Sequence, residues 1–185
     1  MWFVMLVPPL MMLYREVVRP FGGLAIFANN RFATGCRLVS AASRYIILQY
    51  EDILIINVFL SCRSSAHCEK EFIDCLASIM YDVSELHYSS IIFGGDMNTD
   101  ITETTVLSNV LVNFVHDLGL KFVDDKLPVD GRHTFRVIST GATSTIDHFA
   151  VSETMYDAIN MVKVIDSGIN LSDHCPLIVD VNITV

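Results

Sequence analysis

The chain has 185 residues, which suits one domain and is ample for a buried core. Hydrophobic residues make up 52 % of the sequence and charged residues 18 %, a globular composition that excludes a disordered chain. The formal net charge of −9 argues against a broad basic surface for duplex DNA, so a polyanionic substrate is held by local contacts and a metal ion, or a role on DNA is weak or lost.

The chain begins with a strongly apolar stretch from Met1 to Tyr14. It is too short for a membrane span, which needs roughly 20 apolar residues. No basic residue precedes the apolar run and Pro8-Pro9 interrupts it, so a signal peptide is only the weaker alternative. We expect residues 1–18 to be an atypical, replaced or truncated start, and residues 19–185 to form the domain.

The first half of the remaining chain predicts three strands and a helix. A strand over Leu24–Ala28 follows Gly22-Gly23, and Arg44–Tyr50 and Ile53–Leu60 predict a hairpin because Glu51-Asp52 divides two apolar runs. The helix is predicted over Ala66–His87, where apolar residues recur every three or four positions. These apolar residues are Phe72, Leu76, Ile79, Val83 and Leu86.

The second half predicts a buried strand over Ile91–Phe93 and a helix over Thr104–Leu118, with Thr102, Thr104 or Thr105 as its cap. Five short strands are expected after it, at Lys121–Val123, His133–Val137, Ile146–Val151, Met161–Ile165 and Leu177–Ile183. Interleaved strands and helices of this kind indicate a layered α/β protein with a sheet-on-sheet core, in which the strand order stays open.

Polar residues that carry chemistry follow the strand at Ile91–Phe93, in the sequence GGDMN. On an extended chain Asp96 and Asn98 would point to the same side and could address one phosphate. A carboxylate can deprotonate water or bind a hard cation, and an amide can hold an oxyanion. An Asx-type turn after a strand is the equal alternative.

Two further clusters lie near the carboxyl end. In SDHCPL, Asp173 and His174 offer a metal ligand and a phosphate-binding group, although a polar turn closed by proline is the alternative. In STIDHFAVS, Asp147 lies in an apolar context and needs a partner if buried, for which a histidine ring is the obvious candidate. His148 points to the other side of that strand and is expected to be structural.

The order of GGDMN, STIDHFAVS and SDHCPL resembles the endonuclease/exonuclease/phosphatase superfamily. The segments RPFGGLAIF, ILIINVFLSC and GRHTFR look most like the endonuclease domains of non-LTR retrotransposons. The resemblance covers roughly residues 19–185. It implies an α/β fold of DNase I type, a four-layer sandwich of two mainly antiparallel sheets flanked by helices, with the first strands missing.

The resemblance also implies a role for each site residue. Asp96 would position or deprotonate the attacking water, and Asn98 would hold a phosphate oxygen. Asp173 would bind magnesium, with manganese as the alternative ion, and His174, oriented by Asp147, would steady the developing charge on the phosphate. Two hydroxyls would add phosphate contacts, those of Thr134 and Ser172.

The sequence departs from the superfamily in two places. The superfamily begins with strands that carry an asparagine and a metal-binding glutamate, and no such motif lies between Met1 and Val18. Relatives carry a tyrosine hydroxyl near the phosphate where this chain has Phe59, and a proline where it has Ser61. We therefore expect low or absent activity from this chain.

The leading expectation is magnesium-dependent hydrolysis of a DNA phosphodiester by a monomer with no membrane span and no defined protein partner. The five cysteines are odd in number and form no CxxC pair, which favours an intracellular protein, with the nucleus as its location if DNA is the substrate. Two alternatives stay open: an inositol-phosphate or lipid phosphoesterase of the same fold, and a non-catalytic remnant or interaction module.

Overall fold

The structure is a computed structural model that describes residues 10–13, 24–62, 67–128, 133–166 and 172–182. Parts of several predicted regions lie outside these ranges. They are most of the atypical start, the Gly22-Gly23 pair, Ala66 of the helix predicted over Ala66–His87, and Ile183 of the strand predicted over Leu177–Ile183.

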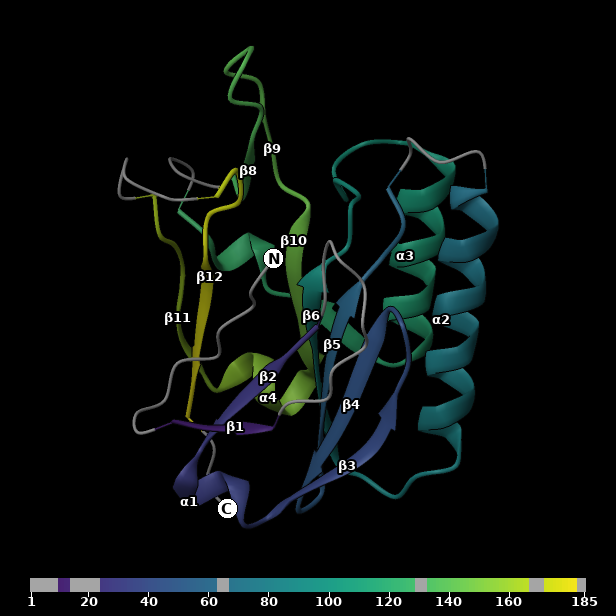
Figure 1. Ribbon diagram of the computed structural model, residues 1–185, viewed down its shortest axis with the longest axis vertical. Helices are drawn as coiled ribbons and strands as arrows, with labels where there is room; N and C mark the ends of the chain where they lie inside the picture. Colours follow the sequence, from purple (N-terminus) through teal and green to yellow (C-terminus); the bar gives the residue numbers. More distant parts are fainter. Residues whose placement is uncertain (1–9, 14–23, 63–66, 129–132, 167–171, 183–185) are drawn as a thin grey trace.

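A six-stranded sheet forms the centre of the fold (Figure 1). Its strands, in spatial order, are β3 (Cys36–Ala41), β4 (Tyr45–Tyr50), β5 (Ile53–Phe59), β6 (Ser90–Asp96), β10 (Asp147–Ser152) and β7 (Leu120–Phe122). Strands β5 and β6 are parallel, and the other neighbouring pairs are antiparallel. The sheet is therefore mainly antiparallel, as the resemblance implied, and β4 and β5 form the predicted hairpin.

Two long helices cover one face of this sheet, α2 (Cys68–Ser84) and α3 (Val106–Asp117) (Figure 1). The predicted apolar stripe of α2 is buried against strands β5 and β6, because residues spaced by three or four positions share one side of a helix. Thr105 caps α3, since its side chain accepts a hydrogen bond from the backbone N–H of Ser108 at 3.1 Å. Both predicted helices are confirmed. Within the described ranges, no helix is both long and apolar enough to cross a bilayer.

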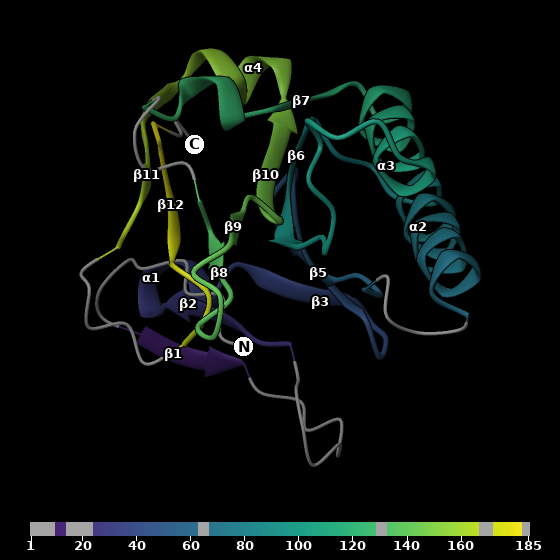
Figure 2. The same ribbon diagram turned by 90° about the horizontal axis from the view of Figure 1, so that it is seen from above.

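Shorter elements cover the opposite face (Figure 2). A second core joins residues of the sheet, such as Ile92 and Phe149, to Val162 and Leu177 of a two-stranded sheet. The elements of this second layer are β1 (Leu10–Leu13), β2 (Ile26–Asn29), α1 (Asn30–Ala33), α4 (Glu153–Asp157), β11 (Ile159–Val164) and β12 (Leu177–Val181). The second sheet of the expected sandwich is present in the described residues as two separate pairs, β1 with β2 and β11 with β12.

The Gly94-Gly95 pair lets β6 lie tightly between its two neighbours. A Cβ atom on Gly95 would lie 2.1 Å from the carbonyl oxygen of Val58 in β5, and the residue has a φ of +141°. A Cβ atom on Gly94 would lie 2.3 Å from the ring of Phe149 in β10. The two glycines thus allow the backbone approach that delivers Asp96 to the end of the sheet.

Candidate active site at the end of the central sheet

Two buried carboxylates face each other where β6 ends and β10 begins. Asp96 and Asp147 are direct partners in the antiparallel register, so their side chains lie side by side on one face of the sheet. Their exposed fractions are 3 % and 2 %. The site lies at the upper edge of the sheet in Figure 1, below the hairpin formed by β8 (Phe135–Arg136) and β9 (Thr143–Ser144).

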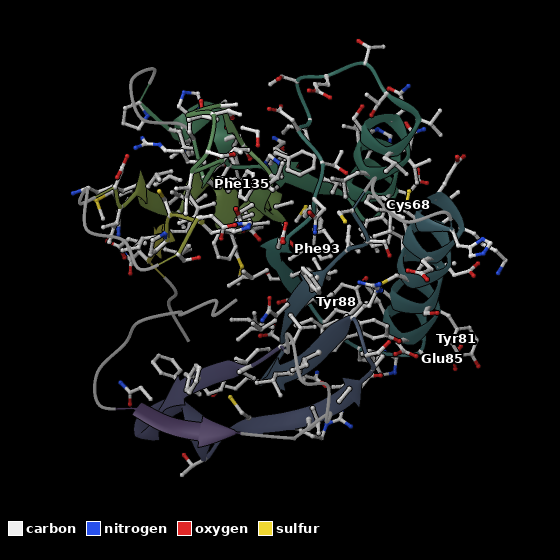
Figure 3. The ribbon with its side chains drawn as sticks, turned by 45° about the horizontal axis from the view of Figure 1, so that its top comes forward. Cys68, Tyr81, Glu85, Tyr88, Phe93 and Phe135 are labelled. Carbon is white, nitrogen blue, oxygen red and sulfur yellow. The ribbon has the colours of Figure 1, made fainter. Side chains whose placement is uncertain are left out.

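His174 joins this carboxylate pair from the loop before β12. Its Nδ1 lies 2.8 Å from Oδ2 of Asp147, so the structure pairs Asp147 with a histidine as the sequence predicted. The ring also packs against Phe135, with ring centroids 4.8 Å apart. Figure 3 shows Phe135 on the far side of Phe93 from the helix that carries Cys68. One ligand atom from each of Asp96, Asp147 and His174 lies within 4.8 Å of the others.

Burial and charge set the protonation of the cluster. Burial, and then the nearby charge of Asp147, raise the pKa of Asp96 to about 7, while the backbone N–H of Asn98 works in the opposite direction. Burial disfavours the imidazolium form of His174, but the hydrogen bond and charge of Asp147 outweigh it and raise the pKa of His174. The cluster therefore contains a carboxyl group with a pKa of about 7 beside a histidine whose protonated form is favoured by Asp147.

Asn98 adopts one of the two conformations that the sequence left open. Its φ of +48° turns the chain, and Oδ1 of Asp96 accepts its backbone N–H at 2.9 Å, which is the Asx-type turn that the sequence left as the alternative. The side-chain amide donates to Oδ2 of Asp96 at 3.1 Å and to the carbonyl oxygen of Leu60 at 2.9 Å. A phosphate oxygen would have to replace one of these acceptors to be held by Asn98.

Asp173 and Ser172 lie on the exposed loop that carries His174. The hydroxyl of Ser172 accepts the backbone N–H of His174 at 3.1 Å and lies 3.3 Å from Oδ1 of Asp173. Among the described residues, the cluster of ligand atoms within 4.8 Å contains Asp96 and Asp147 but not Asp173. The candidate metal cluster is therefore Asp96, Asp147 and His174, and metal binding by Asp173 stays a prediction.

Thr134 is fully buried and connects the parts of the site. Its Oγ1 accepts the backbone N–H groups of Ile146 at 3.1 Å and of Asp147 at 3.0 Å. Its carbonyl oxygen accepts the N–H of Cys175 at 2.7 Å, next to His174. This internal bracing is a role that the sequence did not predict, while the phosphate contact expected of Thr134 stays a prediction that its burial does not favour.

A second buried histidine–carboxylate pair lies on the other side of β10. His148 is fully buried, and its Nδ1 lies 2.6 Å from Oδ1 of Asp124 in the short 3-10 helix η1 (Asp124–Lys126). Its Nε2 lies 2.9 Å from the carbonyl oxygen of Thr99, in the loop that follows Asn98. This confirms the structural placement of His148, and sequence reasoning missed Asp124 because it lies 24 positions from its partner.

The donor set fits a hard divalent cation. Carboxylate oxygens are the ligands that magnesium and manganese prefer, and two buried carboxylates with oxygens within 4.8 Å of each other need a proton or a cation to offset their repulsion. The raised pKa of Asp96 results first from burial and then from that repulsion. The residues present at this edge of the sheet can thus hold a metal ion, position a water molecule and present an imidazolium to an anion.

Comparison by sequence gives no relative: no family profile matches the chain and no curated protein is similar to it. Solved structures do match. A 3′ phosphatase from Neisseria, NExo, bound to a product DNA hairpin, superposes with a TM-score of 0.62 and 20 % identity, covering 77 % of this chain and 66 % of that one. An AP endonuclease from Archaeoglobus fulgidus has a TM-score of 0.61 and 16 % identity over 76 % of this chain and 66 % of its own.

A third structure is the endonuclease domain of TRAS1, a telomere-specific non-LTR retrotransposon, with a TM-score of 0.60 and 17 % identity over 81 % of this chain and 70 % of that domain. The chain covers 66 % of the first two structures and 70 % of the TRAS1 domain, so it spans about two thirds of their length. At such identities the likeness concerns the fold. The central sheet, its two flanking helices and these neighbours together show that the chain has the DNase I-like α/β fold of endonuclease/exonuclease/phosphatase proteins.

Proposed function

We propose that this chain hydrolyses phosphodiester bonds in DNA with the help of a divalent metal ion, as an endonuclease of the retrotransposon type. The observation that carries the proposal is the cluster of Asp96, Asp147 and His174 at the end of the sheet. Hydrolysis of a phosphate ester requires groups of these kinds: a carboxyl group with a pKa near 7, an imidazole held by a carboxylate, and oxygen donors for a metal ion.

Each residue has a distinct task in this proposal. Asp96, with its pKa near 7, accepts a proton from the attacking water at neutral pH. His174 donates a hydrogen bond to a phosphate oxygen and stabilises the charge that develops there, while Asp147 fixes the ring and favours its protonated form. Asn98 is hydrogen-bonded to Asp96, and Ser172 is hydrogen-bonded to the backbone of His174. Both would contact the phosphate after local rearrangement.

The metal ion would be held by the carboxylates at this edge of the sheet. Asp173 is the expected ligand, and Asp96 and Asp147 would supply further oxygens. Magnesium, or manganese in its place, polarises a phosphoryl oxygen and offsets charge on the leaving group when it is bound.

The choice of DNA rests on two supports. The sequence segments resemble retrotransposon endonucleases, and the structural neighbours include the endonuclease domain of such an element and a protein bound to a DNA hairpin. A nuclear location, expected from that substrate, belongs to the same proposal. Because the net charge is −9 and opposes the approach of a polyanion, we expect slow turnover on DNA.

A plasmid-nicking assay tests the proposal. Supercoiled DNA is incubated with the chain, with and without magnesium, and with the variants Asp173→Ala and His174→Gln. We expect nicking that needs magnesium and that falls roughly 10²- to 10³-fold in His174→Gln, as for loss of a group that stabilises developing charge. The matched control is His116→Gln, a histidine with a side chain that is 88 % exposed on α3, which should nick at the wild-type rate.

Absence of nicking by folded wild-type protein would overturn the proposal and favour a non-catalytic role. Nicking that needs Asp173 but is insensitive to the loss of His174 would keep the metal chemistry and reject the charge-stabilising role of His174.

A phosphatase is the second candidate, because the net charge of −9 suits a small phosphate ester better than a DNA duplex and one structural neighbour is a 3′ phosphatase. Release of inorganic phosphate from inositol polyphosphates or from DNA 3′-phosphate ends, measured beside the nicking assay, separates the two functions. Phosphate release without nicking would favour this candidate.

A further inference from the structure

Arg44 lies at the end of the central sheet that carries the candidate active site. Its backbone carbonyl accepts the N–H of Phe59 at 2.9 Å, so it pairs with Phe59 just before β4 begins. Phe59 is in turn the register partner of Asp96 in the parallel pair β5–β6. Arg44, Phe59 and Asp96 therefore occupy successive positions in one row across neighbouring strands, and Asp147 is the next position in that row.

This row places an arginine two strands away from Asp96. Neighbouring strands lie about 4.8 Å apart, so the backbone of Arg44 is about 10 Å from that of Asp96. The guanidinium lies over the ring of Phe59, with 5.8 Å between Cζ and the ring centroid. Nη1 also lies 3.5 Å from the carbonyl oxygen of Phe59. The cation is thus held against the end of β5, next to the residue that partners Asp96.

The carboxylate of Glu71, at the start of α2, keeps this cation in place. Nη2 of Arg44 lies 2.9 Å from Oε2 of Glu71, and the hydroxyl of Ser61 donates to the same oxygen at 2.9 Å. The hydrogen bond from Ser61, and then the charge of Arg44, lower the pKa of Glu71, so the carboxylate is ionised at neutral pH. The side chains of Arg44 and Glu71 keep exposed fractions of 26 % and 47 %, which leaves both accessible to an anion.

We propose that Arg44 binds a phosphate group of the DNA strand beside the scissile bond, and that Glu71 occupies the guanidinium until DNA arrives. A guanidinium offers paired donors to phosphate oxygens and stays charged at all physiological pH values. The proposal explains the two departures at the end of β5: Phe59 provides a ring for Arg44 in place of a hydroxyl for phosphate, and Ser61 holds Glu71.

This inference rests on the proposed DNA substrate, and it is tested by binding rather than by cleavage. A fluorescein-labelled DNA duplex is titrated with the full chain in EDTA, where metal-assisted cleavage is switched off, over a series of salt concentrations. Arg44→Ala should weaken binding roughly tenfold and reduce the slope of log K against log salt by about 0.9, the amount expected for one lost phosphate contact. Glu71→Gln should bind roughly two- to fivefold more tightly, because an exposed ion pair no longer competes for the guanidinium.

The matched control is Arg37→Ala. Arg37 is an exposed arginine in β3 that donates to Gln49 at 2.6 Å, and its loss should leave the slope unchanged. Thermal unfolding of each variant checks the fold, and Glu71→Gln tests the idea even if Arg44→Ala is unstable.

A slope for Arg44→Ala equal to that of Arg37→Ala, or weaker binding by Glu71→Gln, would overturn the role of Arg44. Failure of the wild type to bind DNA at low salt would overturn both this role and the DNA substrate, whereas binding without any nicking would reject only the catalytic proposal.

Discussion

The protonation of Asp96 couples the candidate site to the stability of the fold. The pKa of Asp96 is raised to about 7, so the folded chain holds this proton more tightly than the unfolded chain does. Its contribution to stability is complete below pH 4 and is lost as the pH rises toward and through 7. In EDTA, Asp96→Asn should therefore become increasingly more stable than the wild type between pH 5 and 8, by up to roughly 4 kcal/mol.

Urea unfolding of both proteins across this pH range measures the difference. Magnesium should reduce it at pH 8, since a bound cation offsets the repulsion between Asp96 and Asp147. A difference that stays constant with pH would show that folding does not raise the pKa of Asp96.

At the scale of single residues, the sequence predicted which groups meet but not all of their geometry. The pairing of Asp147 with a histidine follows from the cost of burying a carboxylate, and the structure identifies His174 as the partner. The sequence did not decide between an extended chain and an Asx turn at Asn98. The turn forms only if the carboxylate of Asp96 is free to accept the N–H of Asn98. The brace at Thr134 joins β10 to the loop of His174, and such long-range contacts have no periodic signal.

Strand β6 depends on its glycines in a way that a substitution can measure. Gly95→Ala would place a methyl group 2.1 Å from a backbone oxygen of β5 at a φ of +141°, so either β5 and β6 separate or the chain is strained. We expect a loss of roughly 3 kcal/mol or more in the free energy of unfolding. Gly141→Ala is the control, because that glycine also has a positive φ, of +73°, but no atom lies within 4 Å of the added methyl. It should cost about 1 kcal/mol, and equal losses in urea unfolding would contradict the close-approach argument.

The threonine that braces β10 gives a second prediction at this scale. Thr134→Val keeps the shape of the side chain but removes the acceptor for two backbone N–H groups, those of Ile146 and Asp147. Leaving them unsatisfied should cost roughly 2 kcal/mol or more and lower the nicking rate. Thr134→Ser retains the acceptor and should recover most of both quantities, measured by thermal unfolding and the plasmid assay. Recovery by valine as complete as that by serine would show that packing, not hydrogen bonding, matters here.

Secondary structure was predictable where an element has at least one buried face. The stripe from Phe72 to Val83 produces α2, and the apolar runs in β5 and β6 produce strands that are buried on both faces. Strand β3 was missed because it is an edge strand with mostly exposed or half-buried residues and a register shift near Leu38. Helix α4 was missed because five residues are too few for a helical period to show.

At the scale of the whole molecule, charge limits how DNA can be bound. The net charge of −9 and the acidic site repel a polyanion, and the exposed Lys70, Lys121 and Arg136 are each bonded to a carboxylate. Binding therefore has to come from local contacts such as those proposed for Arg44 and His174, and from the metal ion.

Few phosphate contacts imply a shallow dependence of DNA affinity on salt. Each neutralised phosphate contributes about 0.9 to the slope of log K against log salt, so two or three contacts should give a slope of roughly −2 to −3. Fluorescence titrations of the wild type in sodium chloride at fixed pH, in EDTA, measure it directly. A slope of about −6 or steeper would mean that many cations reach the backbone together. In that case the net charge would be a poor guide to the DNA-facing surface, and Arg44 would be one contact among many.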